Sequence, residues 1–100
     1  MKPIRYSELA RADLREVLAS SRERWGVQQT KRYMAAIRGA ALKIRQTPYV
    51  GRRRDDIDDA TRSVVAGRHL IFYEIHERFI FVQRVLHGNR DHPAHLSPDP

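Results

Sequence analysis

The chain has no cysteine and little glycine, proline or aromatic material. Its 100 residues include five glycines, five prolines and one tryptophan. The absence of cysteine excludes disulfides and thiolate metal sites, and it suits a reducing compartment. No apolar run approaches the ~20 residues of a membrane-spanning helix, and the N-terminus lacks the apolar core of a secretory signal. We therefore expect one soluble cytoplasmic domain with no membrane segment.

Recognisable ligand motifs are also missing. His87, His92 and His95 lie close together in the sequence, but there is no His-Glu-x-x-His and Pro93 interrupts the spacing of a regular helical pair. The aspartates that follow Arg54 do not have calcium-loop spacing. The glycines stand alone, so no phosphate-binding loop is present. We expect neither a metal nor a cofactor.

Basic charge dominates the composition. Nineteen Lys and Arg residues against twelve Asp and Glu residues give a formal net charge of +7 and a pI near 10.5. Positions 24–54 hold nine basic residues and no acidic one. The run Arg52-Arg53-Arg54 is followed at once by Asp55 and Asp56, so this loop is either a solvated, partly self-neutralised connection or a surface for an acidic or phosphate-bearing partner. An exposed ion pair contributes only ~1 kcal/mol, so a cluster of arginines matters more than one.

The first half of the chain has the periodicity of two helices. Ser7 is a suitable N-cap, and small or apolar residues recur after it at three- and four-residue steps. Gly26 is placed to end this first helix. A second helix is predicted from about Val27 to Gln46, before Pro48 prevents its continuation. Because the joint between these two helices is so short, we expect them to pack antiparallel as a helical hairpin.

The second half has the patterns of strands. Besides a short N-terminal strand at 3–6, strands are predicted at 62–65, 67–75 and 79–87. Leu70-Ile71-Phe72-Tyr73 is apolar on both faces, which predicts a central strand. The expected fold is α+β, with the order β-α-α-β-β-β and the helical hairpin packed on an antiparallel sheet. Residues 1–96 form the domain, and 97–100 are expected to be a mobile tail.

Three sequence motifs follow one another between Pro48 and Leu96. The hairpin from Gly67 to His87 is preceded by Pro48-x-x-Gly51-Arg52 and followed by Asp91-x-x-x-His95-Leu96. This pattern resembles the ParE branch of the RelE/ParE superfamily, the toxins of bacterial type II toxin–antitoxin pairs, over nearly the whole chain. The resemblance implies a non-catalytic toxin that inhibits DNA gyrase. It also implies a hetero-oligomer with a ParD-like antitoxin, and contact with operator DNA only through that antitoxin.

Two alternatives remain open. A ribosome-dependent mRNA endoribonuclease of the RelE type would place Arg62, Arg68, Arg84 and His87 around the scissile phosphate, with His87 as general acid or base. The tyrosine that such enzymes carry near the last strand is missing, and His87 is equally suited to holding the tail through a hydrogen bond. The other alternative is a small basic nucleic-acid-binding protein.

The binding surfaces are predicted from the same resemblance. The antitoxin is expected to bury apolar residues of the hairpin, namely Leu14, Leu18, Trp25 and Tyr33. The target is expected to meet arginines outside the core, namely Arg52, Arg53, Arg54, Arg84 and Arg90.

Overall fold

The structure, a computed structural model, describes residues 1–90 and 92–96. Its elements are β1 (Ile4–Tyr6), α1 (Glu8–Gln46), the 3-10 turn η1 (Pro48–Val50), β2 (Arg52–Arg53), β3 (Arg62–Ala66), β4 (His69–Ile75), β5 (Ile80–His87) and α2 (His92–Leu96). The α+β class is confirmed. Within the described residues, no helix is long and apolar enough to cross a membrane. The predicted mobile tail at 97–100 lies outside the described residues.

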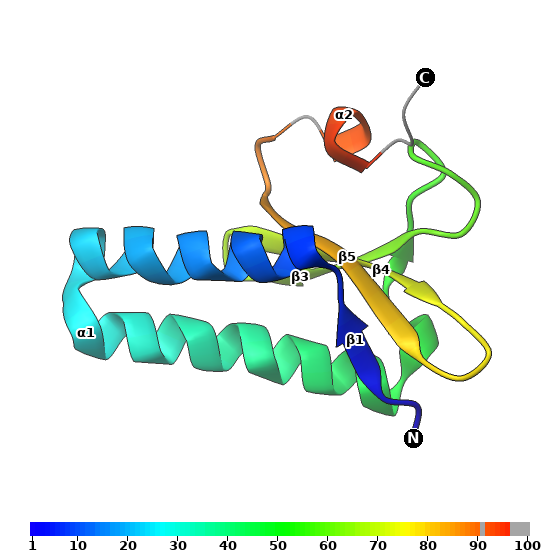
Figure 1. The fold of residues 1–100 in the computed structure, drawn as a ribbon, viewed down its shortest axis with the longest axis horizontal. Coiled ribbons are helices and arrows are strands. Elements are labelled where there is room, and N and C mark those ends of the chain that lie inside the picture. Colours follow the sequence, from blue (N-terminus) through cyan, green and yellow to red (C-terminus); the bar gives the residue numbers. More distant parts are fainter. Residues whose placement is uncertain (91, 97–100) are drawn as a thin grey trace.

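The element α1 is a helical hairpin. It bends at Gly26, whose φ of 81° and ψ of 178° are not helical, so a first arm (8–25) and a second arm (27–46) run antiparallel (Figure 1). The predicted joint is therefore confirmed. At the start of the first arm, the Ser7 hydroxyl accepts a hydrogen bond from the Ala10 N–H at 2.9 Å and donates one to the Gln83 carbonyl at 2.6 Å. The predicted N-cap thus also ties the helix to β5.

The sheet is mixed and has five strands in the order β1-β5-β4-β3-β2. The expected antiparallel arrangement holds for β2 through β5, but β1 pairs parallel to β5, with Ile4 opposite Ile80. Three residues are too few to indicate a strand's direction, and the partner of β1 is the last strand along the chain. Sequence patterns also missed β2, because its two exposed arginines have no apolar alternation. The predicted central position of β4 is confirmed.

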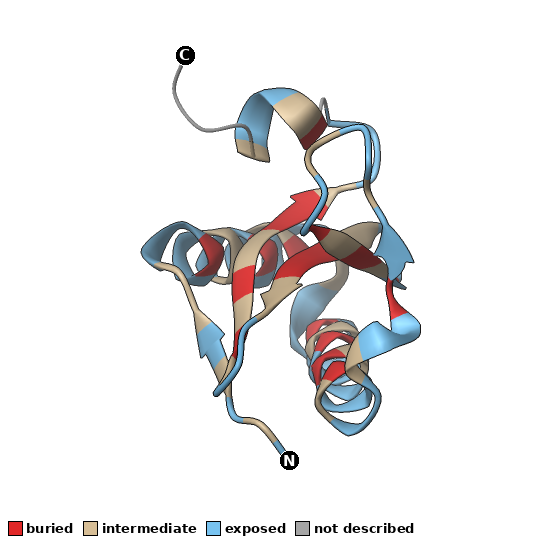
Figure 2. Ribbon diagram, turned by 90° about the vertical axis from the view of Figure 1, so that its right-hand side faces the viewer, coloured by how far each residue is buried: buried red, intermediate tan, exposed pale blue. Residues whose placement is uncertain are grey.

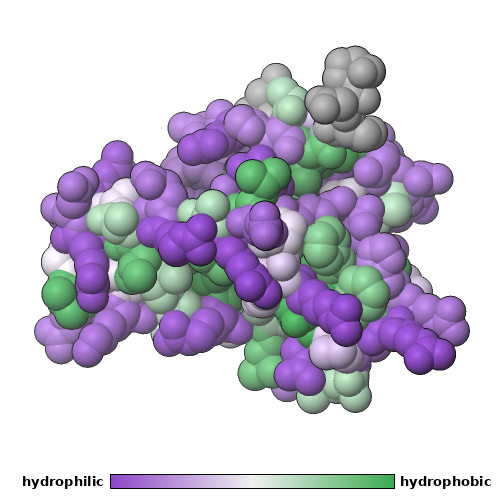
Figure 3. Space-filling view, viewed as in Figure 1, coloured by the Kyte–Doolittle hydropathy of each residue, from purple (hydrophilic) through white to green (hydrophobic). Residues whose placement is uncertain are grey.

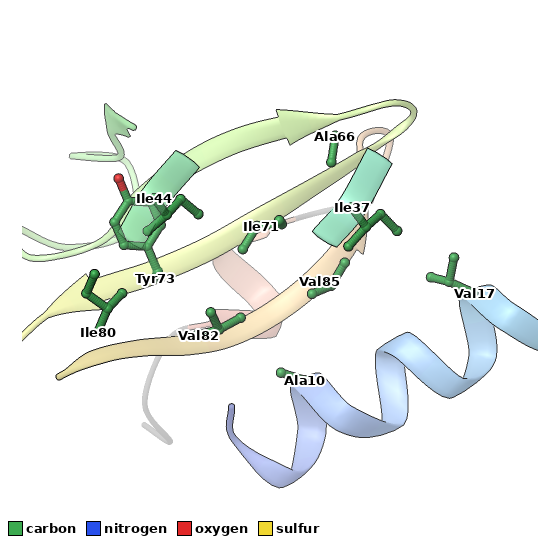
Figure 4. Close-up of a cluster of buried hydrophobic side chains, with 10 residues drawn as sticks. All are labelled: Ala10, Val17, Ile37, Ile44, Ala66, Ile71, Tyr73, Ile80, Val82 and Val85. Atoms are coloured by element: carbon green, nitrogen blue, oxygen red, sulfur yellow. The ribbon is translucent and has the colours of Figure 1, made fainter. Parts of the chain in front are cut away.

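The core lies between the hairpin and one face of the sheet. Both arms contribute small or aliphatic residues, and β3, β4 and β5 supply the opposing side chains (Figure 4). The buried residues lie along the strands and on the sides of the arms that face the sheet (Figure 2). Each fully buried aliphatic side chain contributes about 1.5–3 kcal/mol. These contacts therefore account for most of the attraction between hairpin and sheet.

A β-bulge at Gln83 changes which side chains of β5 face the hairpin. Tyr73 pairs with Val82, whereas Phe72 pairs with Arg84, so Gln83 is the extra residue. As a result Val82 and Val85 both reach the core, although their spacing does not fit strict alternation. The polar pair Gln83-Arg84 interrupts the apolar run of β5 at this bulge.

The helix α2 covers the other face of the sheet (Figure 1). The ring of His92 lies 4.9 Å from the ring of Phe72, and the Arg54 guanidinium lies 5.2 Å from the same ring. Phe72 is fully buried as a result. The Nε2 atom of His92 also lies 3.1 Å from the His87 carbonyl oxygen, which fixes α2 to the end of β5.

The turn between β3 and β4 gives a first prediction. Gly67 has a φ of 62°, and an added Cβ would lie 2.5 Å from Cε1 of Tyr33, whereas a Cβ at Gly39 meets nothing within 4 Å. We expect Gly67→Ala to lose ~1–3 kcal/mol through strain and steric overlap. The matched control Gly39→Ala should be neutral or gain up to ~1 kcal/mol. Thermal melts of both variants test this. A Gly67→Ala protein that melts no lower than wild type would contradict the turn geometry.

Candidate functional site

The loop after α1 is held by a buried tyrosine. Tyr73 is fully buried in β4, and its hydroxyl donates to the Pro48 carbonyl at 2.6 Å and accepts from the Gly51 N–H at 2.9 Å. Arg62 donates to the Gly51 carbonyl at 2.8 Å. An added Cβ at Gly51 would lie 2.8 Å from Cε1 of Tyr73, so the position has no room for a side chain. Burial raises the pKa of the Tyr73 hydroxyl, so it keeps its proton for these bonds. These contacts explain the spacing Pro48-x-x-Gly51.

The three arginines after this loop have different surroundings. Arg54 makes two hydrogen bonds to Asp56, at 2.9 and 2.7 Å, and its side chain is only 11% exposed. The hydrogen bond from Arg54 lowers the pKa of Asp56. Arg53 pairs with Asp55 at 3.1 Å, but both side chains are mostly exposed. Arg52 is exposed and has no carboxylate partner within the described residues. Arg52 and Arg53 therefore present their charge to solvent, whereas Arg54 is packed against the sheet.

Arg84 joins the first arm to β5. Its Nε and Nη2 atoms donate to the carboxylate of Asp13 at 2.8 and 2.9 Å, and the Val85 N–H donates to the same carboxylate at 3.0 Å. Both side chains are largely covered, at 14% and 13% exposure. The hydrogen bonds that Arg84 donates to Asp13 raise the pKa of Arg84. Arg84 thus lies at a structural contact, away from the exposed arginines of the loop.

A basic pocket lies near the joint of the hairpin. It has a volume of about 180 Å³, and its cationic and aromatic wall consists of Arg24, Trp25, Tyr33, Arg68, His69, His87 and Arg90. The Tyr33 hydroxyl lies 2.6 Å from Nδ1 of His69 and accepts from the Arg68 N–H at 2.8 Å. Burial lowers the pKa of His69, and electrostatic interactions with His87 and Arg90 lower it further.

An apolar groove runs between the two arms. Leu18, Val27, Thr30 and Met34 form its floor, and the cationic side chains on its rim are Arg22, Lys31 and Arg38. Its volume is about 230 Å³, and Leu18 and Val27 are 37% and 56% exposed. Figure 3 shows hydrophobic side chains among hydrophilic ones over the hairpin. The Thr30 hydroxyl donates to the Gly26 carbonyl at 2.7 Å, so this hydroxyl is already paired within the helix.

The structure separates the residues predicted to bind the antitoxin. Leu18 lies in the apolar groove, while Trp25 and Tyr33 contact each other in the basic pocket, with ring centroids 5.4 Å apart. Leu14 packs against the core. These residues therefore lie in the groove, in the basic pocket and against the core, and they do not form a single patch.

Only part of the ribonuclease set comes together. Arg68 and His87 share the basic pocket. Arg62 is bound to the Gly51 carbonyl and lies 4.9 Å over the Tyr49 ring, and Arg84 is bound to Asp13. The Nδ1 atom of His87 lies 2.6 Å from Oδ1 of Asn89, so this histidine has a local partner at the end of β5. The described residues contain no group of three or more His, Asp or Glu side chains that could hold a metal ion.

Sequence reasoning missed Asp13, Tyr73 and His69 as site residues. Asp13 falls between Ala10 and Val17 on the inward side of the first arm, and a carboxylate there signals a buried cationic partner. Tyr73 gave no such signal, because a tyrosine in an apolar strand predicts core packing whether or not its hydroxyl has a special partner. His69 lies at the start of the Gly67–His87 hairpin, where the sequence gives no sign of its contact with Tyr33.

A helical hairpin on a mixed sheet is also the architecture of a solved structure titled "Chromosomal ParDE TA system from P. aeruginosa". The likeness has a TM-score of 0.75 at 15% identity and covers 87% of this chain and 96% of that chain. It shows the class of fold.

Sequence comparisons identify the family. Residues 4–92 match the family described as ParE toxin of type II toxin-antitoxin system, parDE. Toxin ParE1 of Caulobacter vibrioides is 33% identical over 96% of this chain and 99% of that protein. Toxin ParE1 of Mycobacterium tuberculosis is 36% identical over 85% of this chain and 88% of that protein. The chain belongs to the ParE toxin family of type II toxin–antitoxin systems, as the sequence motifs predicted.

The contacts of Tyr73 give a second prediction. Tyr73→Phe leaves the Gly51 N–H and the Pro48 carbonyl without their buried partner, which should lower the free energy of unfolding by ~1–3 kcal/mol. Tyr49→Phe is the matched control, because Tyr49 is 70% exposed and its ring stays available to Arg62. It should change stability by no more than ~0.5 kcal/mol. Urea unfolding of the two variants measures the difference, and equal stabilities would rule out the Tyr73 contact as an anchor.

Proposed function

We propose that this ParE-family protein is a cytoplasmic toxin that inhibits DNA gyrase by binding, without catalysis. Its family membership supports the toxin role, and the positions of the arginines support the non-catalytic reading. Two of the four residues that a ribonuclease would need, Arg62 and Arg84, are bound to a backbone carbonyl and to Asp13. An inhibitor needs only a complementary surface, whereas a nuclease needs its charged groups gathered around one phosphate.

A ParD-like antitoxin is the proposed silencing partner, in a hetero-oligomer that contacts operator DNA through the antitoxin. The apolar groove supports this, because exposed aliphatic side chains flanked by Arg22, Lys31 and Arg38 suit an amphipathic helix with acidic flanks. We propose that the antitoxin segment contacts Leu18 in the groove and continues toward Trp25 and Tyr33 at the joint, while Leu14 supports the groove from the core side.

The groove yields a prediction with a closely matched control. Val27 in the groove and Val65 on β3 are both exposed, at 56% and 67%. Val27→Ala removes two buried methyl groups from the complex and should weaken antitoxin binding by ~1 kcal/mol or more, about fivefold. Val65→Ala should leave the affinity unchanged. Calorimetry with the cognate antitoxin measures both variants, and equal affinities would place the antitoxin elsewhere.

The proposed gyrase-binding surface centres on the arginines that face solvent. Arg52, Arg53 and Arg90 are exposed, so their charges are available to an acidic protein surface. Arg54 and Arg84 belong to the predicted set as well, but each is already paired with a carboxylate. We propose that these two act by holding the loop and the end of β5 in place. Binding through the exposed arginines should weaken as salt rises.

A RelE-type ribonuclease remains the second candidate, because Arg68 and His87 share the basic pocket. His87→Ala separates the two functions. Loss of a general acid or base typically lowers a rate by ~100- to 10,000-fold. For a gyrase inhibitor, the variant should lose inhibition only as far as the Asn89 contact loosens the end of β5.

The measurement uses wild type and His87→Ala in two assays, gyrase supercoiling and messenger cleavage on translating ribosomes. We expect inhibition of supercoiling by both proteins and no ribosome-dependent cleavage by either. Cleavage by wild type that disappears in the variant, with supercoiling unaffected, would overturn the gyrase proposal.

A further inference from the structure

The basic pocket has an excess of positive charge. Among the residues that the structure describes, three arginines and two histidines line it, and Glu16 is the only carboxylate. Arg24, Arg68 and Arg90 make no ion pair within residues 1–90 and 92–96. The nearby carboxylate of Asp13 is occupied by Arg84 and the Val85 N–H. Gathering like charges in one pocket is unfavourable unless an anion offsets it.

Contacts within the fold hold the ring of His69 and the backbone of Arg68. The Tyr33 hydroxyl lies 2.6 Å from Nδ1 of His69 and binds the Arg68 N–H, so the histidine ring and the turn that carries Arg68 are held together. The His69 and His87 rings meet edge to face, with centroids 5.3 Å apart. When the Tyr33 hydroxyl donates to Nδ1, the proton of neutral His69 is on Nε2, which leaves this atom as a donor.

We propose that the basic pocket binds a phosphate group. At about 180 Å³ it is smaller than the ~300–1,000 Å³ typical of drug-sized ligand sites, so it suits one compact anion. Arginine binds phosphate oxygens through paired N–H donors. A phosphate monoester carries a charge of about −1.5 to −2 and three acceptor oxygens, which matches several cationic donors better than a single carboxylate does. The proposal concerns binding alone and does not depend on gyrase being the target.

Binding should change the protonation of His69. Burial lowers its pKa, and electrostatic interactions with His87 and Arg90 lower it further, while Asp13 acts in the opposite direction. The other charged or titratable side chains of the pocket are Glu16, Arg24, Tyr33 and Arg68. A bound phosphate adds negative charge beside the ring and favours the imidazolium. The pKa of His69 should therefore rise when phosphate binds.

Trp25 provides the readout. It is the single tryptophan of the chain and lines the basic pocket, so its fluorescence reports on occupancy. The full chain, free of antitoxin, is titrated with inorganic phosphate at constant ionic strength set with chloride. We expect a saturable change in Trp25 fluorescence and, by NMR, an upward shift in the pKa of His69.

Two variants with the same change in charge test the assignment. Arg68→Gln removes the guanidinium but keeps the backbone N–H that binds Tyr33, and it should weaken phosphate binding by ~10- to 100-fold. Arg11→Gln on the exposed side of the first arm is the control and should bind like wild type. An unchanged titration with Arg68→Gln, or equal losses in both variants, would overturn the proposal.

Two further titrations identify the source of the phosphate. A short single-stranded oligonucleotide that binds more tightly than inorganic phosphate, with the same loss in Arg68→Gln, indicates a nucleic-acid backbone. Equal or weaker binding of the oligonucleotide indicates a free phosphate or phosphate monoester. A Trp25 response to a glutamate-rich peptide alone, or no saturable response to either phosphate source, would show that the pocket is not a phosphate site.

Discussion

The buried hydroxyl of Tyr73 constrains much of this fold. Its ring belongs to the core, so the hydroxyl must find its partners inside the protein, and it finds them at Pro48 and Gly51. The chain leaving α1 is thereby drawn across β4 before it turns into β2. These contacts hold the backbone directly before the three arginines 52–54 in place, and Arg62 on β3 binds the Gly51 carbonyl of the same turn. The core and the proposed gyrase-binding surface are thus parts of one unit.

Two further polar contacts attach the hairpin to the sheet. Asp13 joins the first arm to β5, and Tyr33 joins the second arm to the turn between β3 and β4. Together with the apolar core, these contacts use the sides of the arms that face the sheet. The groove between the arms has no covering element within the described residues, so Leu18 and Val27 stay exposed. Exposed aliphatic residues on an otherwise polar hairpin are the physical reason to expect a partner there.

Local signals made much of this architecture predictable. Ser7, Gly26 and Pro48 mark helix boundaries through the chemistry of their own side chains or backbone, and these boundaries agree with the structure. The parallel pairing of β1, the bulge at Gln83 and the contact between Tyr73 and Gly51 depend on residues far apart in the sequence. Charge patterns located the basic residues and the neighbouring partners of Arg53 and Arg54. They did not reveal the partner of Arg84, because Asp13 is 71 positions away.

The pairing of each arginine says more about function than the net charge does. Arg54 and Arg84 are largely covered and bound to carboxylates, so their charges are compensated within the fold. Arg68 and Arg90 line the basic pocket and make no ion pair within the described residues, so their positive charge has no carboxylate partner there. Within the described residues this uncompensated charge lies apart from the apolar floor of the groove. An apolar segment of the antitoxin in the groove and an anionic ligand in the basic pocket would therefore rest on different residues, except at Trp25 and Tyr33, where the proposed path of the antitoxin reaches the pocket.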